Sequence, residues 1–259
     1  MGATGSGKTT LLQHLNGLLK PTRGKIYIDN INILNSNASV DRVKKNIGIV
    51  FQFPEMQFFE ESVFKDVAYG PRNLGLDSKE VLKRVKNSLQ AVGLEYERYY
   101  NRSPFHLSSG EQRRLAIACI LALDPELLIL DEPTIGLDWL SSKKIENIII
   151  DFHKKGRSVI FVTHDINFVS RIAEQIIILD HGRVVFDGRK ELLFNNERIL
   201  RKYDLPFPEI MAFMNKLKEH GIPVNNNIYT IDKAKEELNK ILADEKYRKL
   251  VKNYLFLSA

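Results

Sequence analysis

The first nine residues constrain the fold of this chain more than any other stretch. Within them, Gly2, Gly7, Lys8 and Thr9 match the pattern G-x-x-x-x-G-K-[ST] of a phosphate-binding loop. Glycines let successive backbone N–H groups point inward at an anion, and a helix that begins at Lys8 directs its positive dipole end at the same point. We expect Lys8 to neutralise the β- and γ-phosphates of a nucleotide and the Thr9 hydroxyl to bind Mg²⁺. The expected nucleotide contacts are Gly2, Ala3, Thr4, Gly5, Ser6, Gly7, Lys8, Thr9 and Thr10.

Two alternatives bear on this loop. A glycine-rich turn before a helix would share part of the pattern, but it would not require the Lys-Thr pair directly after the glycines. The strand that ordinarily precedes such a loop is absent, as is an upstream aromatic residue for a base, since only Met1 comes first. Loss of a central strand leaves backbone groups unpaired. A gene model that starts late, or a fragment of a longer chain, would account for the missing strand. We therefore expect these 259 residues, made alone, to fold poorly and to bind ATP weakly.

Composition excludes several classes of protein. The 259 residues are 44% hydrophobic and 27% charged, which is ordinary for a globular protein with one large or two modest domains. No stretch approaches the roughly 18 uninterrupted apolar residues of a membrane span. The single cysteine, Cys119, excludes an internal disulfide and lies in an apolar run that predicts a buried thiol. The net charge of +6 permits an anionic partner without choosing among nucleotide, nucleic acid and lipid.

Apolar strands alternate with helices along the chain, which predicts a parallel sheet covered on both faces. The expected strands are residues 25–28, 47–51, 127–130, 158–162, 175–179 and 183–186. The expected helices are residues 8–19, 79–92, 115–123, 141–155, one around 210–217, and 231–242. Residues 53–106 are less regular and more helical, so we interpret them as part of a helical insertion. Ser108 and Glu111 have the spacing of a capping box.

Four polar residues fall where predicted strands end. Gln52, Asp131, Glu132 and His164 each lie at or just beyond the carboxyl end of a strand. Ligands of parallel sheets bind outside these ends, so the four should share an edge with Lys8. A phosphate-binding loop by itself does not require so many polar groups.

The complete set resembles the nucleotide-binding subunits of ABC transporters. The motifs follow the order of that family: Walker A (Gly2–Thr9), the Q-loop (Gln52), the signature (Leu107, Ser108, Ser109, Gly110 and Glu111, close to L-S-G-G-Q), Walker B (127–131, then Glu132), the D-loop (135–138) and the switch histidine (His164). The resemblance covers about residues 1–190. It implies a RecA-like P-loop NTPase with an α/β core of residues 1–52 and 124–195, a helical subdomain of residues 53–123, and a helical extension of residues 196–259.

The resemblance implies a role for each polar residue. Thr9, Gln52 and Asp131 would hold Mg²⁺, because a hard cation prefers oxygen ligands. Glu132 would orient or deprotonate the attacking water, and His164 would stabilise charge at the γ-phosphate. Glu132, His164 and Gln52 are therefore the expected catalytic residues of an ATP hydrolase. A solvated acidic turn for residues 131–132 and a surface or capping role for His164 are the structural alternatives.

The signature is expected to act on the nucleotide of a second chain. In the family, two ATPases meet head to tail, so Ser108, Gly110 and Glu111 would contact the ATP of an identical or paralogous partner. Ser108 and Glu111 capping their own helix is the alternative, and both can hold. Ser109 replaces a glycine of the family, and we expect its Cβ to crowd backbone near the γ-phosphate. Ser109→Gly should therefore preserve or raise ATPase activity.

Finer features resemble the ATPases of energy-coupling factor transporters. These are Phe51–Glu55 followed by Gln57–Phe59, the stretch 204–209, and residues 221–223. They imply an ATPase at the cytoplasmic face of the membrane that powers uptake of a vitamin or transition-metal ion. Its partners would be a membrane coupling subunit and a solute-binding membrane subunit, with no nucleic acid. Phe53, Phe58 and Phe59 form either core packing or a groove for a membrane-subunit helix, and in the second case Phe58→Asp should release a folded ATPase.

Other interpretations remain open at this point. A basic cluster near the end, formed by Lys246, Arg248, Lys249 and Lys252, fits a solvated helix face better than contact with anionic lipid. A soluble ABC-type ATPase acting on DNA is the main alternative function. Gln52 and Ser108 are, however, only 56 positions apart (108 − 52), too few for the long coiled coil of chromosome-maintenance proteins. A non-functional truncated ABC ATPase is a further alternative, and a P-loop kinase would leave the signature unexplained.

Overall fold

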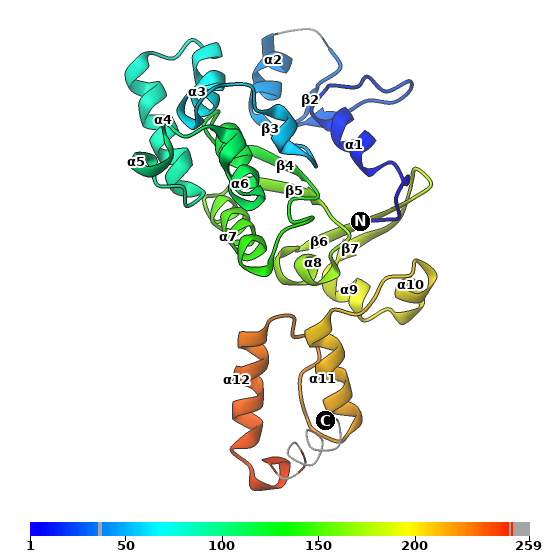
Figure 1. Cartoon of the computed structure of the whole chain (residues 1–259). Coiled ribbons are helices and arrows are strands. Elements are labelled where there is room, and N and C mark those ends of the chain that lie inside the picture. The colour runs from blue at the N-terminus through cyan, green and yellow to red at the C-terminus, as the bar shows by residue number, and fades with distance from the viewer. Residues whose placement is uncertain (36–37, 249, 251–259) are drawn as a thin grey trace. The chain divides into compact units, whose positions relative to one another are not determined.

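A computed structural model describes residues 1–35, 38–248 and 250 of the chain (Figure 1). The chain forms two compact units. We call Thr4–Thr163 the core unit, and Met1–Ala3 together with His164–Ala259 the tail unit. The boundary expected near residue 195 falls inside the tail unit, so the predicted division into ATPase domain and extension stays a prediction.

A parallel sheet forms the centre of the core unit. Its strands are β3 (Ile47–Val50), β4 (Leu127–Asp131) and β5 (Ser158–Val162), in the order β3-β4-β5. Ile49 pairs with Ile129 and Ile129 pairs with Ile160, so the strands start at one level and end at one edge. Leu128, Ile129 and Leu130 are fully buried, as expected for a strand with neighbours on both sides. The predicted parallel sheet of an α/β fold is confirmed.

Helices cover both faces of this sheet. Leu12 of α1 (Lys8–Leu15) packs with Ile129 and Val162. Gly48 of β3 lies on the face of the sheet opposite to α1, because successive residues of a strand alternate between faces. Helix α6 (Ser109–Leu121) covers that face so closely that a Cβ on Gly48 would lie 2.2 Å from Cγ2 of Ile120. Since successive side chains of a strand alternate between faces, α1 and α6 lie on opposite sides. Asp131 shares the face of Ile129, which directs it toward α1.

The segment between β3 and β4 is mainly helical. It contains η1 (Pro54–Gln57), α3 (Val63–Asn73), α4 (Ser78–Ala91), α5 (Tyr96–Tyr99), η2 (Pro104–His106) and α6. Helices α3, α4 and α6 pack against one another through buried residues that include Val67, Val85, Leu89 and Leu115. The helical content predicted for residues 53–123 is therefore present.

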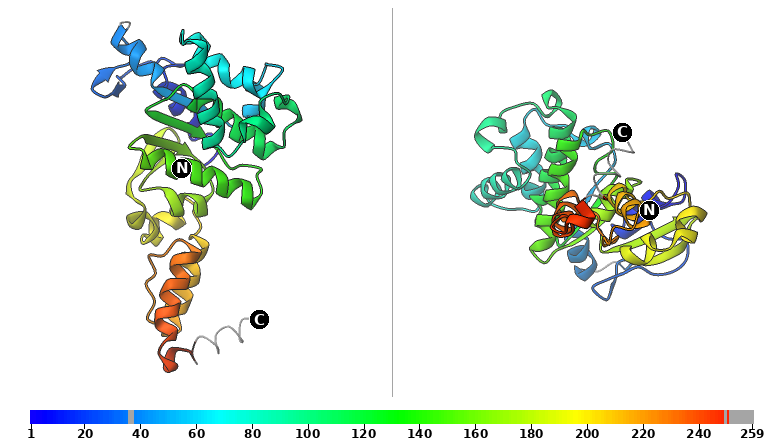
Figure 2. Two further views of the ribbon diagram at one scale, coloured as in Figure 1. Left: turned by 90° about the vertical axis from the view of Figure 1, so that its left-hand side faces the viewer. Right: turned by 90° about the horizontal axis from the view of Figure 1, so that it is seen from below.

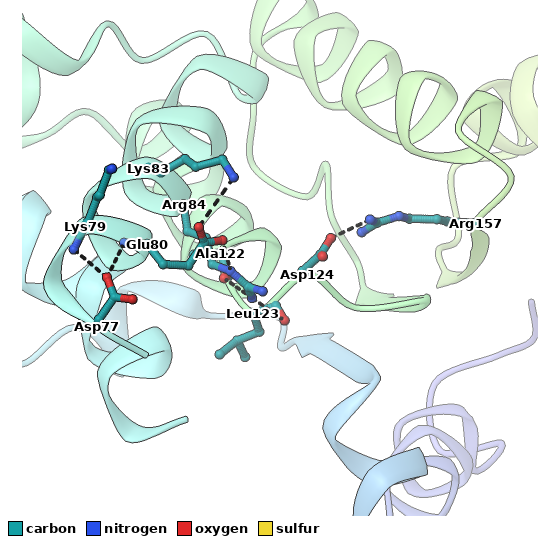
Figure 3. Close-up of polar contacts among 9 residues, drawn as sticks. All are labelled: Asp77, Lys79, Glu80, Lys83, Arg84, Ala122, Leu123, Asp124 and Arg157. Atoms are coloured by element: carbon teal, nitrogen blue, oxygen red, sulfur yellow. Dashed lines mark hydrogen bonds and ion pairs between the residues drawn. The ribbon is translucent and has the colours of Figure 1, made fainter. Parts of the chain in front are cut away.

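Two arginines hold the turn between α6 and β4 (Figure 3). Arg84 of α4 donates from Nη1 to the carbonyl oxygens of Ala122 and Leu123, at 3.3 and 3.2 Å. Arg157, just before β5, donates to the carbonyl oxygen of Pro125 at 2.9 Å and pairs with the Asp124 carboxylate. These bonds satisfy carbonyl groups that the end of a helix leaves without intrahelical partners.

The remaining elements of the core unit are peripheral. A small hairpin of β1 (Tyr27–Ile28) and β2 (Ile31–Asn32) precedes α2 (Ala38–Lys45), and buried Ile33 joins them to Val40 and Val43. Helix α7 (Trp139–Lys154) precedes β5 and packs against it. Gly156 lies in the short connection between α7 and β5 and has a φ of 79°, a left-handed conformation that favours glycine.

The tail unit contains a hairpin and several helices among its described residues. Strands β6 (Gln175–Asp180) and β7 (Arg183–Arg189) pair antiparallel through a turn at His181 and Gly182. Met1 lies beside β6: its amino group donates to the carbonyl oxygen of Ile177 at 2.6 Å, and its carbonyl accepts from the Leu179 N–H at 2.9 Å. The helices are α8 (Ile166–Ile172), α9 (Lys190–Phe194), α10 (Glu197–Lys202), α11 (Glu209–Glu219) and α12 (Ile231–Leu242).

Helices α11 and α12 form a helical pair with its own core (Figures 1 and 2). Met214 and Leu217 of α11 pack with Ile222, Val224 and Ala234. The helical patterns predicted around 210–217 and for 231–242 are therefore confirmed. Lys249 and Lys252 of the predicted basic cluster lie outside the described residues. No helix among the described residues has the length and apolar content needed to cross a bilayer.

The predicted end of the first helix is wrong. The helix predicted for residues 8–19 ends at Leu15, because Gly17 adopts a left-handed φ of 76° and its N–H bonds back to the His14 carbonyl. Leu18, which falls within the range predicted for that helix, lies beyond its end and is 62% exposed. For Cys119 the residue as a whole is partly exposed, but its thiol is buried as predicted, which raises the pKa of that thiol.

Candidate functional site

The phosphate loop has the backbone that its glycines predict. Gly5 and Gly7 have φ of 79° and 97°, in the left-handed region that other residues rarely adopt. A Cβ on Gly5 would meet nothing within 4 Å, so the backbone conformation, and not space, favours glycine there. Helix α1 begins at Lys8 with no acidic residue in its first turn, which leaves its positive end available to an anion.

The side chains of the loop differ in exposure. Thr4, Thr9 and Thr10 are exposed, whereas Ser6 is buried and its Oγ lies 3.5 Å from the Lys8 Nζ. Gly2 and Ala3 belong to the tail unit, so their place relative to Lys8 stays a prediction.

Thr9 and Asp131 meet directly, although 122 positions separate them. The Thr9 hydroxyl donates to Oδ2 of Asp131 at 2.7 Å, which joins the start of α1 to the end of β4. Burial raises the pKa of Asp131, and the neighbouring Glu132 adds to this effect, while the Thr9 hydrogen bond and the Lys8 charge oppose it. A buried carboxylate of this kind is costly when charged unless a cation lies beside it.

The donor set fits a magnesium ion shared with a phosphate. Mg²⁺ prefers oxygen ligands and usually keeps one or two from the protein, with the others from phosphates and water. Thr9 Oγ1 and the Asp131 carboxylate supply such oxygens. Among the described residues, no cluster of three or more His, Cys, Asp or Glu could cage a metal alone. The residues therefore fit Mg²⁺ that arrives with a nucleotide better than a permanently bound metal.

Glu132 adopts an unusual backbone conformation beside Asp131. Its φ is 47°, and its N–H donates to the Val162 carbonyl at 2.8 Å, which extends the pairing of β4 with β5 by one residue. Its side chain is 9% exposed. A left-handed residue other than glycine carries backbone strain, and such residues are concentrated at functional sites.

Gln52 follows β3 and is fixed through its backbone. The guanidinium of Arg113, from the first half of α6, donates to the Gln52 carbonyl. Arg113 is 6% exposed. Sequence reasoning missed this residue, because only the fold brings α6 to a loop 61 positions away. The contact means that the Q-loop backbone and the signature helix are positioned together.

The signature lies at the amino end of α6. Ser108 caps the helix, and the predicted capping box with Glu111 is present. Ser108 and Ser109 are exposed, whereas Gly110 is buried. A Cβ on Gly110 would lie 2.6 Å from Oγ of Ser141. The N–H and the hydroxyl of Ser141 both donate to the carboxylate of Asp138, the D-loop residue that caps α7. Space against α7, and not backbone conformation, therefore requires glycine at 110.

His164 begins the tail unit. It directly follows Thr163, which is 2% exposed, and its own side chain is exposed. Asp165 beside it caps α8 by accepting from the Phe168 N–H at 3.0 Å. Its position relative to Lys8 and Glu132 stays a prediction, because those residues belong to the core unit.

Comparisons with known proteins agree with these motifs. The family model described as "ABC transporter" matches residues 1–135. An energy-coupling factor transporter ATP-binding protein (EcfA2) of Clostridioides difficile is 45% identical over 93% of this chain and 85% of its own length. The protein with that name from Caldanaerobacter subterraneus is 44% identical over 95% of this chain and 86% of its own length.

Solved structures agree on the fold. CbiO1 of Clostridium perfringens, described as part of the ABC transporter complex CbiONQ, superposes with a TM-score of 0.70, 38% identity, and coverage of 83% of this chain and 85% of its own. A dimeric ATP-binding cassette in a post-hydrolysis state with ADP and Pi superposes with a TM-score of 0.64, 34% identity, and coverage of 73% and 83%.

The motif order, the fold and the comparisons lead to one assignment. The phosphate loop, Walker B strand and signature occur in the order of the family, and relatives match almost the whole chain. The chain belongs to the ATP-binding and ATP-hydrolysing proteins of the ABC transporter family, in the branch that serves energy-coupling factor transporters.

Proposed function

We propose that this chain binds Mg²⁺–ATP at the phosphate loop and powers an energy-coupling factor importer for a vitamin or a transition-metal ion. It would act as a peripheral subunit at the cytoplasmic face of the membrane. The observation that carries the proposal is the Thr9–Asp131 contact, with Lys8 preceding one partner and Glu132 following the other. Relatives that bear the names of transporter ATPases support the same function.

The core unit supplies the groups for the nucleotide. The backbone N–H groups of Gly5, Gly7 and α1 bind the phosphates, and Lys8 neutralises their charge. Thr9 and Asp131 would hold the magnesium ion, which neutralises charge on the β- and γ-phosphate oxygens when bound. Burial disfavours the ionised form of Asp131, and a cation held beside this carboxylate would offset that cost.

Hydrolysis requires a group that orients and activates water. Glu132 follows the metal ligand Asp131 directly, and its strained backbone holds the carboxylate at the end of β4. We assign Glu132 as the base that accepts a proton from the attacking water. Gln52 would complete the metal shell and sense the γ-phosphate, while His164 would donate to the γ-phosphate as charge develops there.

A second ATPase chain, identical or paralogous, would complete each nucleotide site. The exposure of Ser108 and Ser109 at the amino end of α6 supports this assignment, because a surface group can meet a ligand held by another chain. Gly110 would let the signature backbone lie close to α7 and the D-loop. Two solved relatives are described as dimeric, which supports pairing with a second chain.

An exposed apolar surface after the Q-loop would receive the membrane coupling subunit. Phe53, Met56 and Phe59 are 52%, 83% and 60% exposed, whereas Phe58 is only 7% exposed. Phe58→Asp would bury a charge, so it tests folding and docking together and is a poor probe of this surface. Phe59 is the better probe: its ring lies 4.7 Å from that of Tyr69, and Asp66 accepts from the backbone N–H groups of Phe59 and Glu60.

Reconstituted transporter tests this proposal. Complexes that contain the chain should couple ATP hydrolysis to solute uptake into vesicles, and Phe59→Asp should lower both the co-purification of the membrane subunits and the uptake. Leu82→Asp, at an exposed apolar residue of α4, serves as the matched control elsewhere on the surface, because it also replaces an exposed apolar side chain with one carboxylate. ATPase activity stimulated by DNA and unaffected by membrane subunits would instead support the soluble alternative.

A further inference from the structure

Both hydrogen-bond donors of the signature serine go to one carboxylate oxygen. The Ser108 N–H and the Ser108 hydroxyl each donate to Oε2 of Glu111 at 2.9 Å. The hydroxyl oxygen also accepts from the Glu111 N–H at 3.4 Å. A hydroxyl has one proton, so Ser108 cannot donate to a phosphate while it donates to Glu111. The signature serine is therefore already engaged by its own helix.

A buried tyrosine holds the other carboxylate oxygen. The Tyr99 hydroxyl, at the end of α5, donates to Oε1 of Glu111 at 2.6 Å. Tyr99 is 6% exposed, and the guanidinium groups of Arg98 and Arg102 lie 5.4 and 5.1 Å from the centre of its ring. Donation from Tyr99 is the main reason that the pKa of Glu111 falls to about 2. Glu111 is thus a fixed anion.

This anion occupies the end of α6 where another anion is expected. The positive end of a helix favours one negative group within its first turn, and Glu111 lies in the first turn of α6. A γ-phosphate that approaches Ser108 would meet the negative charge of Glu111 and would compete for the same proton. The family pattern has a neutral glutamine at this position, which neither repels a phosphate nor demands that proton.

We propose that Glu111 competes with the γ-phosphate of the partner's nucleotide for the Ser108 hydroxyl, and that Tyr99 is the positioning residue that moderates this competition. By donating to Oε1, Tyr99 holds the carboxylate against α5 and withdraws part of its charge from Ser108. This inference rests on the proposed function, because it requires that the signature meets a nucleotide. It adds Tyr99, which lies outside every motif of the sequence, to the residues that set ATP affinity.

Steady-state kinetics of the assembled transporter tests the inference. Glu111→Gln keeps a residue compatible with the capping box, removes the charge and leaves a neutral amide oxygen that holds the serine proton more weakly, so KM for ATP should fall about threefold or more. Tyr99→Phe leaves the carboxylate with one fewer donor and should raise KM for ATP by about threefold or more, with a smaller effect on kcat. In the Glu111→Gln background, Tyr99→Phe should change KM by less than about 1.5-fold, because no charge remains to moderate.

Matched controls separate positioning from stability. Tyr96→Phe removes a hydroxyl from the same helix, stacked on Tyr100, and should leave KM unchanged. Thermal melts of all variants report folding, and the Glu111→Gln result stands even if Tyr99→Phe melts early. Unchanged or raised KM in Glu111→Gln, or an equal Tyr99→Phe effect in both backgrounds, would overturn the inference. Failure of the proposed function is distinct, since the unmodified complex would then show no transport-coupled ATPase activity.

Discussion

The phosphate loop and the signature use similar residues in opposite ways. At the loop, Thr9 reaches a buried carboxylate from another element, Asp131, and the oxygens of this contact fit the magnesium ion proposed above. At the signature, Ser108 is exposed and bonds within its own helix. The Thr9–Asp131 contact is therefore assembled inside the core unit from two of its elements, whereas the signature serine is a surface group whose donors are engaged within its own helix.

Glycine has a different function at each place. Gly5 and Gly7 have left-handed backbones that favour glycine whatever the surrounding space. Gly110 is an ordinary helical residue, and glycine is required there because Ser141 lies so close. The comparison teaches that the loop glycines shape a ligand cradle, while the signature glycine fixes α6 against α7 and the D-loop.

Loss of the loop cation should have the largest effect. Lys8→Ala removes the charge that neutralises the phosphates, and we expect ATP binding to weaken by about 10²-fold. Lys20→Ala, an exposed lysine shortly after α1, is the control and should bind as the unmodified chain does. Isothermal titration with the assembled complex measures both, and equal affinities would show that Lys8 does not contact the phosphates.

Asp131→Asn should separate function from stability. The Mg²⁺ concentration for half-maximal ATPase activity should rise about tenfold or more, since an amide replaces a charged ligand. Burial raises the pKa of Asp131 in the folded protein, so ionisation costs stability as pH rises above the unfolded-state pKa. The Asn variant should therefore melt no lower than the unmodified chain at pH 7 with EDTA. A markedly lower melt would mean that ionised Asp131 stabilises the empty site.

Gly110→Ala should destabilise the core unit. Its Cβ would lie 2.6 Å from Ser141 Oγ, and overpacking of this kind costs about 1–3 kcal/mol. The second change Ser141→Ala removes the clashing oxygen and should recover most of that loss. Denaturant unfolding measures both steps. If the double variant is no more stable than Gly110→Ala, the glycine is not required for packing.

Ser109→Gly should have the smallest effect. Ser109 is exposed at the first position of α6, with no positive φ that would favour glycine. We expect ATPase activity to stay equal or to rise up to about twofold, because a Cβ near the partner's phosphate is removed. A loss of most activity would indicate that the Ser109 side chain itself contacts the nucleotide.

The sequence predicted contacts that depend on motifs and strand ends. Thr9 follows the glycines of the loop, and Asp131 follows an apolar run. These two patterns were enough to predict that Thr9 and Asp131 lie together, because ligands of parallel sheets bind at the edge where the strands end. The capping box of Ser108 and Glu111 is local and equally predictable. The end of α1 was not predicted, since leucines continue in helical register beyond Gly17, where the backbone turns left-handed.

Contacts between distant segments could not be predicted. Nothing near Tyr99 or Arg113 in the sequence indicates that they bond to Glu111 and Gln52. The packing of α5 and of the segment after β3 against α6 creates those contacts. Likewise, neighbouring phenylalanines do not reveal which is buried: Phe58 lies inside and Phe59 outside only because Asp66 fixes the loop between them and α3.

Single-turnover hydrolysis by Glu132→Gln tests the central claim most directly, namely that the loop, Asp131 and Glu132 form one ATPase site. The assembled complex would be mixed with radiolabelled Mg²⁺–ATP, and retained nucleotide and released phosphate would be followed together. The account predicts that the variant retains ATP as well as the unmodified complex does and releases phosphate at least about 10²-fold more slowly. Phosphate release at an undiminished rate would contradict it.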